Sequence, residues 1–108
     1  MVELLLMLWI QTVTVPATWQ WTNASGPVEF YEMAMTTDNG VTWSMIELNI
    51  TPMNGNTQFT ITPPLGMKYK VRVRAGGTAG GEVGYGEWSE ASAMFSGTGK
   101  PGKPKLND

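Results

Sequence analysis

The stretch KYKVRVRA, residues 68–75, alternates basic and apolar side chains along its whole length. Successive side chains of a β-strand point to opposite faces of a sheet, so this alternation predicts a strand with one face in the core and one outside it. The expected core residues are Tyr69, Val71 and Val73. The outer face carries all the basic residues that precede the C-terminal tail, which are Lys68, Lys70, Arg72 and Arg74.

Like charges along one strand face repel one another unless neighbouring groups compensate them. The sequence supplies carboxylates at Glu32, Glu87 and Glu90, and the indole ring of Trp88 is a further partner for a cation. We therefore interpret the basic stripe as an internally paired sheet face. The alternative interpretation is that its arginines form a recognition strip for an acidic partner.

The rest of the chain shows the same period of two and no helical periodicity. Turn-forming residues at 38–40 (DNG) and 54–56 (NGN) separate the segments. About seven short strands, with no helix for a parallel crossover, predict an all-β, antiparallel two-sheet sandwich of the immunoglobulin-like class. Besides residues 68–75, the expected strands are ATWQWT (17–22), VEFYEMAM (28–35), VTWSMIEL (41–48), TQFTIT (57–62), EWSEASAMFSG (87–97) and the opening run (1–10).

The composition restricts the chemistry that the chain can perform. Its 108 residues make one domain, which we place at residues 1–96, followed by a Gly/Pro/Lys-rich linker or tail at residues 97–108. The sequence has no His and no Cys, which excludes histidine bases, thiolate nucleophiles and imidazole or thiolate metal sites. We expect no catalytic residue, no metal and no cofactor. With a formal net charge of -2, we expect no nucleic-acid partner either.

The opening MVELLLMLWI, residues 1–10, is apolar but shorter than the roughly 20 residues that span a membrane, so we expect no membrane span. It predicts a first strand that is apolar on both faces. The alternative is a processed secretory signal, in which TVPA at residues 14–17 resembles a small-residue cleavage site. An edge strand would turn about half of its side chains outward. We expect Leu5, Met7 and Trp9 to pack against a neighbouring subunit or adjoining domain, which predicts oligomerisation through this strand.

The order and spacing of several residues resemble a fibronectin type III domain over residues 12–96. Trp21 and Tyr31 look like that family's strand B tryptophan and strand C tyrosine. PPLGMKYKVRVRA, residues 63–75, resembles the segment that ends strand E and opens strand F. The resemblance implies that Trp21, Tyr31 and Tyr69 are core residues. It also implies that Tyr69 is a corner tyrosine, whose hydroxyl bonds the backbone a few residues upstream.

The segment GEWSEAS, residues 86–92, is similar to the start of strand G in that family. It also looks like the WSxWS box of cytokine-receptor modules, with Ala91 in place of the second tryptophan. In those receptors the box tryptophans interleave with basic residues of strand F. The similarity implies that Trp88 packs against Arg72 or Arg74, and these three residues are candidates for the interaction surface.

Residues 76–86, GGTAGGEVGYG, lie between the basic strand and this box. Their glycines lack the spacing of a dinucleotide-binding fingerprint, and no helix follows them. We expect a mobile hairpin loop. Because the recognition loops of sandwich domains gather at one end, Tyr85 is a candidate aromatic anchor for a partner.

These features predict a non-catalytic structural or interaction module. TTDNGVTWSMI, residues 36–46, looks like a hairpin of bacterial and tailed-phage versions of the family. That similarity favours a spacer or display domain of a phage virion (tail or capsid) or of a bacterial surface or secreted protein. The alternative function is a carbohydrate-binding accessory module, whose exposed sheet-face aromatics (Trp43, Trp88 or Phe30) would stack on a glycan.

Overall fold

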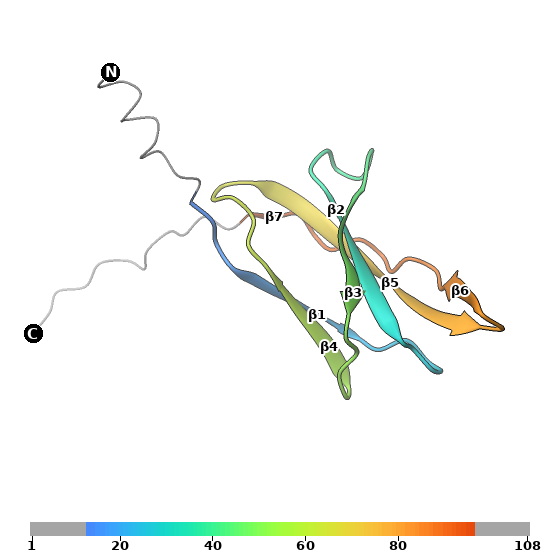
Figure 1. Cartoon of the computed structure of the whole chain (residues 1–108). Coiled ribbons are helices and arrows are strands. Elements are labelled where there is room, and N and C mark those ends of the chain that lie inside the picture. Colours follow the sequence, from blue (N-terminus) through green and yellow to red (C-terminus); the bar gives the residue numbers. More distant parts are fainter. Residues whose placement is uncertain (1–12, 97–108) are drawn as a thin grey trace, which may run out of the picture.

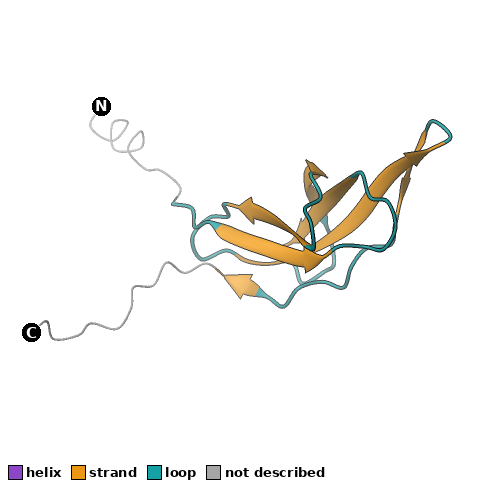
Figure 2. Ribbon diagram, turned by 90° about the horizontal axis from the view of Figure 1, so that it is seen from below, coloured by secondary structure: helices purple, strands orange, loops and turns teal. Residues whose placement is uncertain are grey.

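The computed structural model describes residues 13–96, which form a β-sandwich without any helix (Figures 1 and 2). A two-stranded sheet pairs β1 (Ala17–Thr22) with β4 (Asn56–Ile61). The larger sheet has the order β3 (Ser44–Ile50), β2 (Phe30–Thr36), β5 (Lys68–Ala79) and β6 (Glu82–Tyr85), and β7 (Phe95–Ser96) also pairs with β5. All pairings are antiparallel. The predicted fold class, all-β with two antiparallel sheets, is confirmed.

The core lies between the two sheets and is aromatic on both sides. Tyr31 and Tyr69 of the larger sheet are buried, and each meets a half-buried tryptophan of β1 edge to face. The ring centroids of Trp21 and Tyr31 lie 5.4 Å apart, and those of Trp19 and Tyr69 lie 5.9 Å apart. Such T-shaped contacts are the favoured geometry of aromatic pairs. Aromatic side chains therefore join the sheets.

The alternation of β5 sorts its side chains as the sequence predicts. Tyr69, Val71 and Val73 are buried in the core, whereas Arg72 and Arg74 lie on the opposite face. Both arginines are only half-buried, because other side chains cover them. The outer face of the larger sheet is therefore a second packed layer.

The turn between β2 and β3 forms where the DNG signal predicts it. Asn39 and Gly40 have φ values of 59° and 92°, a conformation that asparagine and glycine tolerate best. The carboxylate of Asp38 accepts hydrogen bonds from the hydroxyl of Thr36 and from the amide and hydroxyl of Thr42. The turn is thus closed by its own polar side chains.

The glycine-rich stretch forms a hairpin, as predicted, but most of it is paired strand and not loop. β5 continues through Ala79 and pairs with β6, with Ala79 opposite Glu82. The two residues between them, Gly80 and Gly81, have φ values of 63° and 86°. A two-residue hairpin turn of this kind needs positive φ at both positions, which glycine supplies without steric cost.

The predicted last strand, residues 87–97, is also wrong in extent, because strand geometry appears only at Phe95–Ser96. Instead, the segment contacts β5 at every third residue. The amides of Gly86, Ser89 and Ser92 donate to the carbonyls of Ala75, Val73 and Val71, respectively. Three residues of this segment therefore accompany two residues of β5, which excludes a regular β-ladder. The described chain begins and ends at one end of the sandwich, where Thr14 pairs with Pro64 and β7 pairs with the start of β5 (Figure 1).

Candidate interaction surface

Alternating aromatic rings and guanidinium groups cover the outer face of the larger sheet. The guanidinium carbon of Arg72 lies 4.2 Å from the ring centroid of Trp43 and 4.6 Å from that of Trp88. The guanidinium carbon of Arg74 lies 4.6 Å from the centroid of Trp88 and 4.0 Å from that of Tyr85. The contacts form one series, Trp43–Arg72–Trp88–Arg74–Tyr85, which we call the cation–aromatic ladder. Each such contact contributes roughly 0.5–1 kcal/mol at an exposed site.

Arg74 is also held by a carboxylate of the neighbouring strand. Its Nε lies 2.7 Å from Oε1 of Glu32, which faces it across the β2–β5 register. Glu32 is only 5% exposed, which places its charge in a desolvated position, and the ion pair with Arg74 compensates that charge. Within residues 13–96 this is the one ion pair, and the expected alternatives Glu87 and Glu90 stay exposed without a salt bridge.

Two serines position Trp88 in the ladder. The hydroxyl of Ser89 accepts a hydrogen bond from the amide of Val73, and the hydroxyl of Ser92 accepts one from the amide of Val71, each at 3.0 Å. Their own amides donate to the same two β5 residues. Each serine therefore satisfies both backbone groups of a β5 residue, and this fixes the segment that carries Trp88.

The sequence predicts contact of Trp88 with one arginine, but the structure places Trp88 over both. The sequence does not predict Trp43 or Tyr85 as members of the ladder, because they come from other hairpins and only the tertiary fold brings them to the arginines. Trp43 supplies the second ring over Arg72, a role that the resemblance to the WSxWS box gives to position 91. Tyr85, proposed as a flexible anchor, ends β6 under Arg74.

The candidate glycan platforms are already engaged within the molecule. Trp43 and Trp88 contact Arg72, and the ring of Phe30 meets Tyr85 edge to face at 6.2 Å. Phe30 also covers Gly76, where a Cβ atom would overlap its ring. These contacts occupy ring surface that a sugar would need.

The hydroxyl of Tyr69 has a different partner from the one that a corner tyrosine implies. It accepts a hydrogen bond from Nε1 of Trp19 at 3.1 Å, across the sandwich. Burial raises the pKa of Tyr69 above its ordinary value, and the bond from Trp19 partly offsets this rise. The hydroxyl of Tyr31 instead accepts from the amide of Ala24 at 2.8 Å. Both tyrosines therefore tie the two layers together.

A second surface, which the sequence does not indicate, is offered by the edge strand β3 and the turn before it. Leu48 of β3 is 58% exposed, Met45 and Ile46 of the same strand are also exposed, and Val41 in the preceding turn is 81% exposed. Two register shifts interrupt the pairing of β3 with β2. Such irregularities protect a strand edge from further pairing, so this surface offers apolar side chains rather than backbone groups.

The predicted contact residues Leu5, Met7 and Trp9 lie outside the described residues. Within residues 13–96, no group of three or more acidic side chains is arranged to hold a metal ion, and no helix is long and apolar enough to cross a bilayer. Comparison with protein-family models, with curated proteins and with solved structures finds no match.

Proposed function

We propose that this chain is a non-catalytic module, similar to a fibronectin type III domain, that displays or spaces protein-binding surfaces in a virion or extracellular assembly. The observation that carries the proposal is the cation–aromatic ladder. It uses both arginines and four aromatic or carboxylate partners of one sheet face for internal packing. A face closed in this way is suited to a stiff scaffold, since both guanidinium groups lie against aromatic rings and Arg74 is also paired with a carboxylate.

The other polar contacts support the same proposal. Asp38 closes the β2–β3 turn, and Glu47 accepts hydrogen bonds from two backbone amides of its own strand. Glu29 accepts hydrogen bonds from the amide and hydroxyl of Thr78 and so ties the β5–β6 hairpin to the loop that precedes β2. These carboxylates are engaged in holding turns and strands, whereas a catalytic acid or base must be free to reach a substrate.

The likeness to fibronectin type III domains is supported by three residues that the resemblance names. Trp21 packs on Tyr31 across the two sheets, and Tyr69 lies in the centre of the core. The serine-anchored segment after β6 supports the likeness to the WSxWS box, because both serines bind β5 while Trp88 joins its arginines. The proposed virion or extracellular location follows from the resemblance of the 36–46 hairpin.

A glycan array and a panel of chromogenic hydrolase substrates test the non-catalytic part. We expect no saturable turnover of any hydrolase substrate. We also expect no glycan binding that depends on Trp43, which the variant Trp43→Ala tests by removing one candidate platform. Saturable hydrolysis by the full chain would contradict the proposal. The genes next to the one that encodes this chain test the proposed virion or extracellular location. Neighbouring tail or capsid genes would support a virion protein. A neighbouring glycosidase gene, together with measured glycan binding, would favour the carbohydrate-binding alternative.

Oligomerisation through residues 1–10 belongs to the same proposal. A concentration series of the full chain in the analytical ultracentrifuge, with Leu5→Glu as the variant, measures it. We expect a rise in sedimentation coefficient with concentration that is weakened by the introduced charge, because a carboxylate is costly to bury in an apolar interface. A monomer at every concentration, unaffected by Leu5→Glu, would contradict this part.

A further inference from the structure

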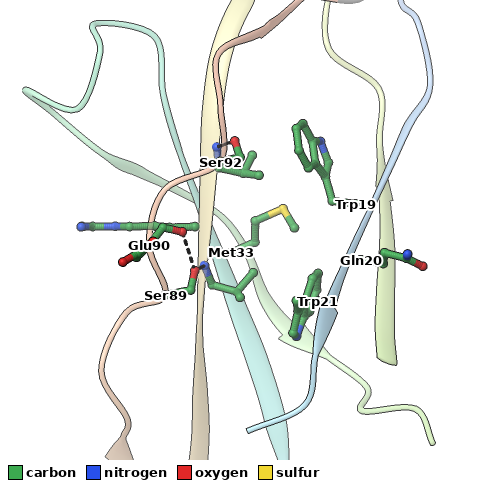
Figure 3. Close-up of a pocket in the computed structure, with 10 residues that line it drawn as sticks. Trp19, Gln20, Trp21, Met33, Ser89, Glu90 and Ser92 are labelled. Carbon is green, nitrogen blue, oxygen red and sulfur yellow. Dashed lines mark hydrogen bonds between the residues drawn. The ribbon is translucent and has the colours of Figure 1, made fainter. Parts of the chain in front are cut away.

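The small sheet of β1 and β4 has two edges with different surroundings. Beside β1, the side chains of Trp19, Trp21 and Met33 line a groove of about 270 Å³, and the serine-anchored segment lies on its far side (Figure 3). Beside β4 there is no further strand, because β4 pairs only with β1, and β3 belongs to the larger sheet. Among residues 13–96, the outer edge of β4 is therefore open.

The register of the small sheet shows which backbone groups this edge offers. The amide of Val15 donates to the carbonyl of Pro63, two residues beyond the last strand pair of β1 and β4. Hydrogen-bonded and non-hydrogen-bonded pairs alternate along an antiparallel ladder, so the odd-numbered residues of β4 bond to β1. The N–H and C=O groups of Gln58 and Thr60 therefore point away from β1, towards the open edge.

The edge of β4 lacks the features that usually protect a strand from unwanted pairing, which are charged side chains, bulges and prolines within the strand. The register between β1 and β4 runs through six pairs without a shift, whereas the pairing of the edge strand β3 is shifted twice. Pro63 and Pro64 lie beyond the end of β4, and no charged residue occurs between Glu47 and Lys68. A further strand can therefore pair with β4 without meeting a charge.

An apolar groove between the two layers runs along the same edge. It has a volume of about 320 Å³, and its apolar lining includes Met35 and Ile46 of the larger sheet and Phe59 and Ile61 of β4. Phe59 is half-buried, and Ile46 is 37% exposed. A strand added to β4 would cover this apolar surface while its backbone bonds to Gln58 and Thr60. Free backbone groups beside apolar pockets are the combination that favours strand addition.

We propose that the open edge of β4 binds β4 of a second copy of this chain, antiparallel and about a two-fold axis at Phe59. Gln58 of each copy then lies opposite Thr60 of the other copy and exchanges two backbone hydrogen bonds with it. This axis keeps residues 57–61 of both copies in the ladder. It also places the two half-buried phenylalanine rings side by side, and aromatic cross-strand pairs stabilise antiparallel sheets. The two small sheets become one sheet of four strands.

The sequence of β4 favours a second copy over an unrelated chain. In the proposed register each side chain meets a compatible one, since Thr57 lies opposite Ile61 and Gln58 lies opposite Thr60. Like charges do not oppose each other across the axis, because residues 48–67 carry none. A two-fold contact uses one patch twice, and it is the commonest form of association between identical subunits. The inference rests on described residues alone and is independent of the proposed function.

Sedimentation velocity of the full chain over a range of concentrations tests the association. The ladder is shorter than a standard interface of roughly 1,200–2,000 Å², so we expect a weak dimer, with a dissociation constant between about 1 μM and 1 mM. A chain that stays monomeric throughout this range overturns the proposal.

Amide hydrogen exchange, resolved by residue with NMR, locates the contact. We expect exchange at Gln58 and Thr60 to slow in proportion to the fraction of dimer. The amides of Phe59 and Ile61 bond to β1 and are the internal control, because they are protected at every concentration. Dimer formation without added protection at Gln58 and Thr60 overturns the proposal.

Two double variants test the register. Gln58→Glu with Thr60→Lys places opposite charges in both pairs across the axis, whereas Gln58→Lys with Thr60→Lys places like charges there. Both side chains are exposed in the monomer, so we expect both variants to fold, which far-UV circular dichroism checks. We expect the dissociation constant of the like-charged variant to be at least about tenfold higher than that of the oppositely charged one. Equal dissociation constants overturn the register.

Leu5→Glu separates this dimer from the oligomerisation proposed above. Association that Leu5→Glu abolishes, and that the like-charged variant leaves intact, overturns the β4 dimer and supports the other contact. Association that survives Leu5→Glu but is lost in the like-charged variant, and kept in the oppositely charged one, supports the β4 dimer alone. The failure of one proposal is therefore distinguishable from that of the other.

Discussion

Nε of Arg74 lies 2.7 Å from Oε1 of Glu32, and the guanidinium group also stacks over Trp88 and Tyr85. One side chain of β5 thus joins a neighbouring strand, the β6 hairpin and the serine-anchored segment. Because Glu32 is desolvated and Arg74 is partly exposed, loss of the carboxylate removes a charged hydrogen bond but leaves the cation with its two rings.

We expect Glu32→Ala to lower the free energy of unfolding by about 1.5–3 kcal/mol, the range for a hydrogen bond to a charged group. Urea denaturation at neutral pH measures this change. Glu87→Ala is the matched control, since Glu87 is exposed and forms no ion pair, and its effect should stay within about 0.5 kcal/mol. Equal effects of the two variants would show that the ion pair does not stabilise the fold.

Trp88 contacts both guanidiniums, so its removal should cost more than that of a ring at the end of the ladder. We expect Trp88→Ala to destabilise the fold by roughly 1–2 kcal/mol from the two cation–π contacts, with further loss from its half-buried indole. Trp43→Ala removes only the contact with Arg72 and is the comparison. Denaturant midpoints followed by far-UV circular dichroism avoid the change in tryptophan fluorescence. A larger effect for Trp43→Ala would contradict the central position of Trp88.

Substitution of Gly76 and of Gly84 by alanine should have opposite consequences for stability, although both residues lie in the same hairpin. A Cβ atom at Gly76 would overlap the ring of Phe30, which packs on the backbone there. We expect Gly76→Ala to cost about 1–3 kcal/mol, as overpacking does elsewhere, and to displace the ring from Tyr85. Gly84→Ala meets no atom within 4 Å and should leave thermal unfolding almost unchanged. Similar melting temperatures for the two variants would disprove the predicted contact.

Asp38 should make stability depend on pH in the acid range. Hydrogen bonds from the hydroxyls of Thr42 and Thr36 and the amide of Thr42 lower the pKa of Asp38 from 3.8 to about 2. The folded state therefore favours the carboxylate, and the resulting stability is present above pH 3.8 and is lost as the pH falls towards 2.

Urea midpoints measured between pH 5 and pH 2 should fall less steeply for Asp38→Asn than for the wild type, because the amide does not titrate. Thr42→Val removes the donor with the largest effect and should give an intermediate slope. An unchanged slope in Asp38→Asn would show that other carboxylates cause the acid sensitivity.

The strand faces could be predicted because they depend on local alternation. Val71 and Arg72 point to opposite sides in any strand, whatever its neighbours are. The ladder could be predicted only in part. Trp88 follows a recognisable pattern, but Trp43 reaches Arg72 only because β3 and the serine-anchored segment both flank the β2–β5 pair, and that arrangement is a tertiary property.

The glycine-rich stretch shows how a local signal can be hidden. Gly80 and Gly81 are a two-residue turn signal, but the further glycines at 76, 77, 84 and 86 remove the side-chain alternation that would mark the flanking strands. The predicted strand at residues 87–97 is too long for a related reason. Ser89 and Ser92 replace strand pairing by side-chain hydrogen bonds with a period of three, which apolar alternation does not indicate.

Because Val13 and Ser96 lie at the same end of the sandwich, the fold responds unequally to force. A tensile load between these two residues would pull the layers apart at that end and break hydrogen bonds one at a time. A load applied along the strands would instead be shared in shear by a whole row of bonds. The mechanical strength of the domain would then depend on where the chain is gripped.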